Sequence, residues 1–195
     1  CKDDLFPKNF IINLSAPSNY IGPNTLFGIS TVYEEERAEL PIIEYIKEGD
    51  YLEDKTKSKK QKLLKDLPIS LIQAIKHYFV STAIRRARGQ KTAHSSMLIN
   101  VSQYIKKQDD VYRLVNAQVI EYCDQIDCLD DNPAFEKDLE SIFLEKITHS
   151  NSIICQMYPE WSDRLDMPLW TNVREELRFV AAKVRNEVRV IHSST

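Results

Sequence analysis

The chain has 195 residues, of which 43% are hydrophobic and 28% charged, and its formal net charge is −3 at pH 7. This composition is typical of a globular protein with its own apolar core, and the net acidic charge means that any contact with nucleic acid has to come from a local patch. No apolar run approaches the ~20 residues that span a bilayer and no N-terminal signal is present, which predicts a cytoplasmic protein without membrane contact.

The first 66 residues are predicted to form a strand, an ordered loop and a charged linker. Phe10–Leu14 has the composition of a strand, and the Pro and Gly residues that follow it interrupt any helix. An acidic stretch between Glu34 and Asp54 precedes a lysine-rich stretch between Lys55 and Lys65. Two interpretations remain open for these charges: a solvated hinge or helix face, or, for the lysines, a segment that follows the phosphates of a nucleic acid.

An amphipathic helix is predicted from Leu67 to Gly89. Asp66 is available as its N-terminal cap, Pro68 suits its first turn, and Gly89 stands where a C-terminal cap belongs. Apolar residues recur along it at helical spacing: Leu71, Ile72, Ile75, Phe79 and Ala83. Its last turns carry three arginines, Arg85, Arg86 and Arg88. A favourable interaction with the helix dipole explains their position but not their number.

The remainder of the chain is predicted to alternate strands and helices. Met97–Val101 is apolar apart from Asn100 and is typical of a central, buried strand. Helices are predicted at 109–127, through Phe135 to Ile147 after a turn and cap formed by Asp130–Pro133, and at 168–183, and a second strand at 188–191. The sequence therefore predicts a helix-rich α/β fold with a partial parallel sheet. Because the chain begins and ends beside predicted strands, we expect it to be a piece of a longer protein.

Two groups of polar residues are candidates for contacts with phosphate or the DNA backbone. Ligands of open α/β sheets bind at the carboxyl ends of the strands, where the sequence places Ser102 and Gln103, and then His192 and Ser193. The second group precedes the first strand and contains Arg85, Arg86, Arg88, Lys91 and His94. It lies at the opposite end of that strand, so one combined pocket is not predicted. Ordinary loop residues and a protein interface remain the alternatives.

No catalytic group and no metal site are predicted. The chain has no Gly-rich phosphate loop with Gly-Lys-Ser/Thr, and no carboxylate pair follows an apolar strand to hold magnesium. His94 with Ser95 and Ser96 lacks an orienting acid and an oxyanion site. The four cysteines have neither CxxC spacing nor a histidine partner at zinc-finger spacing. The isolated chain is therefore expected not to hydrolyse a nucleotide.

Five stretches resemble the Z1 domain family. The central ones are Leu67–Ile75, Ala83–Gln90 and His94–Ile99. Residues 4–28 look like the segment after the first motor lobe's Thr-Ala-Thr-Pro motif, and residues 188–194 are similar to the strand before the nucleotide-contacting motifs of the second lobe. The resemblance implies an endonuclease- or helicase-type protein of bacterial restriction and phage-defence systems. Residues 128–166 carry little that aligns.

The resemblance also implies a domain organisation. Residues 1–66 would be the end of a first-lobe segment with a charged linker, and residues 67–195 the first half of a second RecA-like lobe with a helical insertion at 128–166. The phosphate loop, the acidic motif and the Gln-x-Gly-Arg motif would lie outside the chain. ATP and Mg²⁺ are therefore implied only for the longer superfamily-two helicase-like hydrolase.

The function implied by the resemblance is to contact the DNA backbone and to couple the two lobes of the motor. Expected partners are DNA, the remaining lobe segments and a nuclease or other subunit of the defence system. The alternative is a non-enzymatic helical interaction module that docks a nuclease or ATPase partner, with Arg85, Arg86 and Arg88 as its interface.

Overall fold

The computed structural model describes residues 21–28, 39–46, 65–100 and 105–191. They belong to two compact units, residues 1–44 and residues 45–195. In the first unit, helix α1 spans Pro23–Phe27, and the backbone N–H of Leu40 donates a 3.1 Å hydrogen bond to the carbonyl of Leu26. The predicted strand Phe10–Leu14 and most of the charged linker lie outside the described residues.

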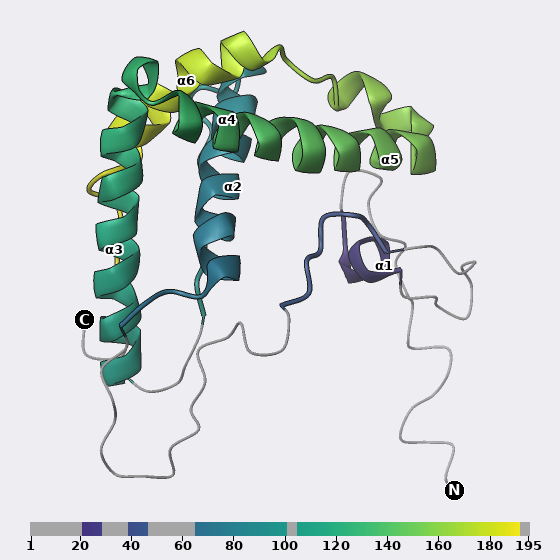
Figure 1. Cartoon of the computed structure of the whole chain (residues 1–195). Coiled ribbons are helices and arrows are strands. Elements are labelled where there is room, and N and C mark those ends of the chain that lie inside the picture. Colours follow the sequence, from purple (N-terminus) through teal and green to yellow (C-terminus); the bar gives the residue numbers. More distant parts are fainter. Residues whose placement is uncertain (1–20, 29–38, 47–64, 101–104, 192–195) are drawn as a thin grey trace, which may run out of the picture. The chain divides into compact units, whose positions relative to one another are not determined.

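The second unit is built from long helices. Its elements are α2 (Ile69–Ala87), α3 (Ile105–Asp127), η2 (Leu129–Asp131), α4 (Pro133–Ser141), the π-helical segment η3 (Ile142–Thr148), α5 (His149–Met157), η4 (Pro159–Arg164) and α6 (Trp170–Val184). Helices α2 and α3 run alongside each other, and α4, η3 and α5 form one continuous rod across their ends (Figure 1). Helix α6 packs against both α2 and α3.

Helix α2 ends as the sequence predicts. The backbone N–H of Gly89 donates to the carbonyl of Arg86 (2.9 Å), and that of Gln90 donates to the carbonyl of Arg85 (3.0 Å). This pair of bonds is the Schellman motif, which needs a residue with positive φ, and Gly89 has φ of 87°. At the N-terminal end of α2 the predicted cap, Asp66, is wrong. The N-cap residue is Pro68, and no side-chain hydrogen bond caps the helix there.

The predicted helices after α3 are confirmed. The side chain of Asn132 accepts a 3.3 Å hydrogen bond from the backbone N–H of Phe135, and Pro133 occupies the first position of α4. Along α6, Val173, Leu177 and Val180 are buried, as their helical spacing predicts, whereas Leu169 is exposed before the helix begins. The π-helical turn η3 inside the rod was not predicted.

One apolar core fills the second unit. The rings of Phe79 on α2 and Tyr122 on α3 meet edge to face with their centroids 6.5 Å apart, and the Tyr122 ring stacks on Phe135 of α4. The buried residues of α6 close this core from the third side. Burial of apolar surface from α2, α3, η2, α4, η3 and α6 holds the helices in their relative positions.

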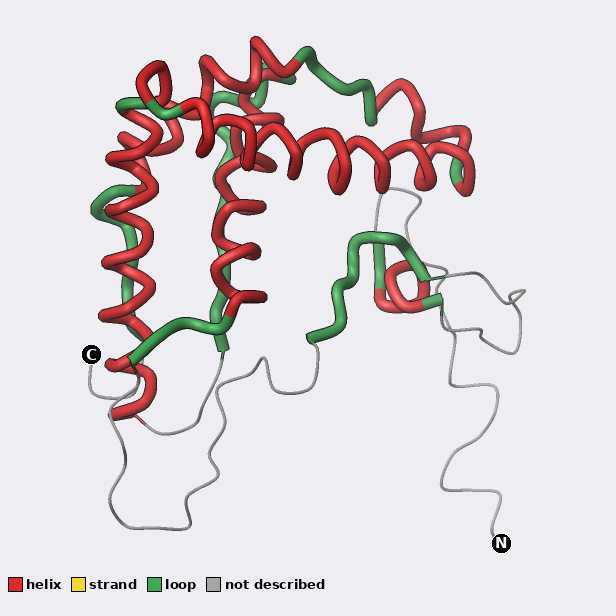
Figure 2. The backbone as a smooth tube through the Cα atoms, in the orientation of Figure 1, coloured by secondary structure: helices red, strands yellow, loops and turns green. Residues whose placement is uncertain are grey.

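The predicted partial parallel sheet is wrong, because no strand occurs among the described residues. Met97–Asn100 and Val188–Ile191 run as extended loops along the helices (Figure 2). Neither segment is paired by a backbone hydrogen bond with another described segment. The side chains of Leu98 and Ile191 are 86% and 83% exposed, which excludes a central strand covered on both faces. The α/β fold and the resemblance to half of a RecA-like lobe are therefore not maintained.

A short apolar run could not distinguish a buried strand from the observed structure. Residues Met97, Ile99 and Val188 do pack against the core, but the surface that they cover belongs to helices. An apolar run in the sequence indicates that its side chains are buried, but it does not indicate which element they pack against. Among the described helices, none is long and apolar enough to span a membrane.

Candidate functional site: a groove between two extended segments

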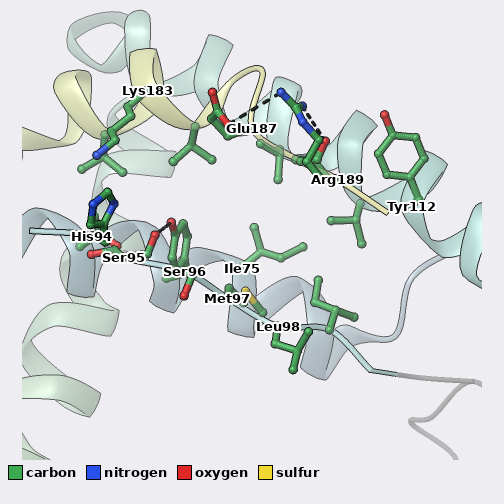
Figure 3. Close-up of a pocket in the computed structure, with 18 of the residues that line it drawn as sticks. Ile75, His94, Ser95, Ser96, Met97, Leu98, Tyr112, Lys183, Glu187 and Arg189 are labelled. Carbon is green, nitrogen blue, oxygen red and sulfur yellow. Dashed lines mark hydrogen bonds and ion pairs between the residues drawn. The ribbon is translucent and has the colours of Figure 1, made fainter. Parts of the chain in front are cut away.

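A groove with a volume of about 700 Å³ opens in the second unit. Helices α2 and α3 and the C-terminal end of α6 form its floor, and two extended segments form its walls (Figure 3). We name these segments the first wall (residues 93–100) and the second wall (residues 187–191). The floor is largely aliphatic and includes Ile75, Val111, Val115, Val180 and Val184. The charged side chains that line the groove lie mainly toward the ends of the two walls.

Side chains along both walls alternate between two environments. In the first wall Ala93, Ser95, Met97 and Ile99 are half-buried, and the residues between them are exposed. The second wall repeats the pattern, with Val188 and Val190 half-buried between exposed neighbours. Successive side chains of an extended chain point to opposite sides, so each wall places one row on the helices and a second row outward.

Arg85 attaches the beginning of the first wall to helix α2. Its Nη1 donates to the carbonyl of His94 (2.9 Å) and to the Oγ of Ser95 (3.0 Å). The hydroxyl of Tyr78, two helical turns earlier on the floor of the groove, donates to the carbonyl of Ser95 (3.1 Å). These hydrogen bonds hold the wall against α2 where it leaves the Gly89 turn.

The other two arginines bind segments that are distant in the sequence. Arg86 donates from Nε to Oε2 of Glu176 on α6 (2.7 Å) and from Nη1 to the carbonyl of Lys91 (3.0 Å). Arg88 donates to the carbonyls of Asp166 (2.7 Å) and Leu165 (3.0 Å). Each arginine fixes a different segment to the end of α2, and this accounts for the presence of three.

Glu176 carries a buried charge at this end of the groove. Its carboxylate accepts hydrogen bonds from Arg86 and lies 3.2 Å from the Nζ of Lys91. Burial by itself raises the pKa of Glu176, but the hydrogen bonds and charges of Lys91 and Arg86 together outweigh burial and hold the pKa below its usual value. The carboxylate is therefore ionised at neutral pH and anchors both cations.

Basic groups lie at both ends of the groove. Lys183 on α6 reaches toward the loop that carries His94, and both side chains are exposed at the same end (Figure 3). In the described part of the chain, neither the Lys183 ammonium nor the His94 imidazole has a hydrogen-bonding or ion-pair partner among the side chains. Arg189 lies farther along the second wall, 3.8 Å from the carboxylate of Glu187. The groove thus has an aliphatic middle between cationic ends.

The structure brings one group of predicted site residues together and leaves the other outside the described residues. Arg85, Arg86, Arg88, Lys91 and His94 all lie at the C-terminal end of α2, but the three guanidinium groups are bonded to the protein itself. Ser102, Gln103, His192 and Ser193 lie outside the described residues.

Sequence reasoning missed Lys183, Glu176 and Arg189. In the sequence Lys183 marks only the end of an amphipathic helix, and in the structure it lies in the last turn of α6, five residues before Val188. Glu176 lies on the buried side of α6, three residues after Val173 and four before Val180, and it pairs there with Arg86. Within the described ranges, no group of three or more His, Cys, Asp or Glu side chains is arranged to hold a metal ion.

The Z1 domain family model matches residues 70–195, which include all of α2 except its first residue, both walls and α6. The chain therefore belongs to the Z1 domain family. No curated protein and no solved structure matches the chain.

Proposed function

We propose that the chain is part of a helicase-type, DNA-acting ATPase or endonuclease of a bacterial restriction or phage-defence system. In this role the Z1 domain contacts the DNA backbone and couples the lobes of the motor. The proposal assigns binding and hydrolysis of ATP with Mg²⁺ to other parts of a longer, cytoplasmic protein and gives the chain itself no catalytic residue.

The observation that carries this proposal is the cationic end of the groove, where His94 and Lys183 lie near Ser95 and Ser96 (Figure 3). Lys91, which is paired with Glu176 and whose side chain is 63% exposed, also lines the groove. Ammonium groups and hydroxyl groups are the usual protein partners of phosphate oxygens. In this proposal Arg85, Arg86 and Arg88 hold the loop in place, and the neighbouring Lys91 and His94 contact the DNA. Because the chain carries a net negative charge, contact with DNA has to come from a local cationic surface such as this end of the groove.

Fluorescence anisotropy of the 195-residue chain with labelled single- and double-stranded DNA tests the proposal. We expect affinity to fall steeply between ~50 and ~200 mM salt. The double variant Lys91→Ala/Lys183→Ala removes two phosphate contacts and should reduce the slope of log affinity against log salt by roughly 1.8 on duplex DNA. Lys146→Ala, an exposed lysine of η3 that does not line the groove, is the matched control and should leave the slope unchanged.

Two results would contradict the proposal in different ways. Absence of binding to either DNA at low salt would remove the DNA-contacting role from this chain. The contact would belong to the linker if replacing Lys91 and Lys183 left DNA binding unchanged while replacing the lysines between Lys55 and Lys65 abolished it.

A second candidate function is favoured by the walls of the groove. A non-enzymatic interaction module that docks a nuclease or ATPase partner needs an open surface with apolar area, and Leu98 and Ile191 provide it on opposite walls. The interface predicted from the sequence, formed by Arg85, Arg86 and Arg88, is less suited to this role because these side chains already bind acceptors within the protein. Docking of this kind requires no DNA.

A further inference from the structure

We propose that the groove binds an extended peptide segment of a partner protein. The segment has apolar side chains at alternate positions and an acidic side chain at the end that meets Lys183 and His94. This inference rests on the docking function and requires no DNA contact, although both proposals use Lys183 and His94. Three features of the groove support it: the main chain of the walls, their exposed aliphatic side chains and the charges at the ends.

Most backbone N–H groups of both walls are available for pairing, and so are their carbonyl groups except those of His94, Ser95 and Val188, which accept from Arg85, Tyr78 and Arg189. Within the described residues, no backbone–backbone hydrogen bond uses the N–H groups of residues 94–100 or 188–191. Both walls run away from the end that holds Lys183 and His94 (Figure 3). An extended chain with unpaired N–H and C=O groups is a template on which another extended segment forms main-chain hydrogen bonds. A ligand between the two walls would have such a template on either side.

The exposed side chains set the apolar part of the ligand. Leu98 on the first wall and Ile191 on the second are among the most exposed large aliphatic side chains of the described chain. Below them the floor is formed by Val111, Val115 and Val184. A paired segment whose side chains alternate in direction would place one row on this floor and cover Leu98 and Ile191 at its edges.

The charged side chains at the ends of the groove determine where the ligand carries its acidic side chain and in which direction it binds. Lys183 and His94 are cationic or protonatable, exposed and close to the beginning of both walls. Arg189, by contrast, shares its charge with Glu187 at 3.8 Å. A carboxylate is therefore best accommodated at the Lys183 end, and its pairing there would fix the register of the bound segment.

A peptide suits the middle of the groove better than a nucleic acid does. Single-stranded nucleic acids are bound by a continuous cationic path and by aromatic side chains on which bases stack. Between its cationic ends this groove presents Met97, Ile99, Val188 and Val190, which are aliphatic or thioether side chains. These groups offer neither phosphate contacts nor stacking surfaces. Two tyrosines also line the groove, but the hydroxyl of Tyr78 is bonded to the Ser95 carbonyl and Tyr112 lies beyond Arg189 at the far end (Figure 3).

The test uses the 195-residue chain and labelled heptapeptides in which Val and Thr alternate after two Asp residues at one end. Anisotropy should show saturable binding, and a peptide with Asn in place of Asp should bind about fivefold more weakly. N-methylation of alternate amides should abolish binding because it removes the main-chain donors. A peptide of the same composition with consecutive Val residues is the sequence control.

Variants of the chain locate the binding site. Leu98→Ser/Ile191→Ser should weaken the peptide about tenfold, and Lys183→Ala about fivefold. Leu144→Ser, an exposed leucine on η3 outside the groove, is the matched control and should have no effect. Because Leu98, Ile191 and Lys183 are exposed, their replacement leaves the core intact, and a urea melt of each variant checks this.

Three results with the peptides overturn the proposal. They are absence of saturable binding by every peptide of the set at millimolar concentration, binding that is indifferent to N-methylation, and binding that is unchanged in Leu98→Ser/Ile191→Ser. Tight binding of oligothymidine that depends on Leu98 and Ile191 would likewise overturn it and assign the groove to nucleic acid. Salt-dependent DNA binding without peptide binding would leave the DNA proposal standing alone, and the converse would leave only the peptide site.

Discussion

Arg86 donates a 2.7 Å hydrogen bond from Nε to Oε2 of Glu176 and so joins α2 to α6 across 90 residues of sequence. Only 17% of the Arg86 side chain and 11% of the Glu176 side chain are exposed. The Arg86 guanidinium also lies 5.3 Å from the centroid of the Phe179 ring. Since Nη1 of the same guanidinium holds the carbonyl of Lys91, one ion pair positions both a helix contact and the loop at the cationic end of the groove.

The first prediction concerns the stability that this ion pair provides. Glu176→Ala should lower the free energy of unfolding by about 3–5 kcal/mol, because it leaves the Arg86 guanidinium buried without its carboxylate. Urea denaturation followed by circular dichroism measures the change. Glu187→Ala breaks the exposed pair with Arg189 and should cost about 1 kcal/mol or less. Equal losses in the two variants would show that burial of the Arg86 pair has no special weight.

The second prediction follows from the lowered pKa of Glu176. In the unfolded chain this carboxyl has its ordinary pKa of 4.5, and in the folded protein Lys91 and Arg86 keep the pKa lower in spite of burial. Its contribution to stability is therefore complete above pH 4.5 and is lost as the pH falls through the lower, folded value. Glu176→Gln should be less stable than the wild-type chain at neutral pH, and the difference should shrink on acidification. Urea midpoints of both proteins measured across this range test the sign, and parallel curves would contradict it.

The helices of the second unit were predictable because their signals are local. Apolar residues every three or four positions, Asn132 before Pro133, and Gly89 after the arginines all act within one or two turns of chain. The strands failed because an apolar run specifies only that its side chains are removed from water. Met97 and Ile99 satisfy that requirement on helices, while Leu98 between them remains in solvent.

The contacts of the candidate site could not be predicted from the sequence. The arginines Arg85, Arg86 and Arg88 form a recognisable cluster before Gly89, and the structure places this cluster beside the groove. Arg85 donates to residues of the following loop, whereas Arg86 donates to Glu176 and Arg88 to the carbonyls of Leu165 and Asp166, which are 77 to 90 residues away in sequence. Which charges neutralise one another across such separations depends on helix packing, and a single sequence carries no direct signal for it. For the same reason Lys183 could not be assigned to the groove.

The third prediction concerns the turn between α2 and the first wall. Gly89 has φ of 87°, and a Cβ added there would meet nothing within 4 Å. The cost of Gly89→Ala is therefore backbone strain alone, about 1–2 kcal/mol of the free energy of unfolding. Gly89→Asn should cost less, because asparagine adopts this conformation more readily than alanine. Urea denaturation of the two variants gives the order, and an alanine variant as stable as the wild type would contradict the role of positive φ.

The fourth prediction uses the cysteines of α3 and its C-terminal end as reporters of opening. Cys123 is fully buried, and its Sγ lies 3.4 Å from the carbonyl of Ala181. Burial raises the pKa of the Cys123 thiol to about 11, against the smaller opposing effect of Arg185, so thiolate is scarce in the folded state. Cys128, five residues later, is exposed.

In a background where Cys1 and Cys155 are replaced by serine, Ellman's reagent at mildly alkaline pH should label Cys128 quickly. Cys123 should react only as fast as the helices separate, because its contact with α6 has to break first. Adding Glu176→Ala, which weakens the attachment of α6 to α2, should accelerate the labelling of Cys123 and leave that of Cys128 unchanged. Rapid labelling of Cys123 in the native chain would contradict the packing of α3 on α6. If Glu176→Ala left the labelling rate of Cys123 unchanged, α6 would separate from α3 without breaking the bond between Glu176 and Arg86.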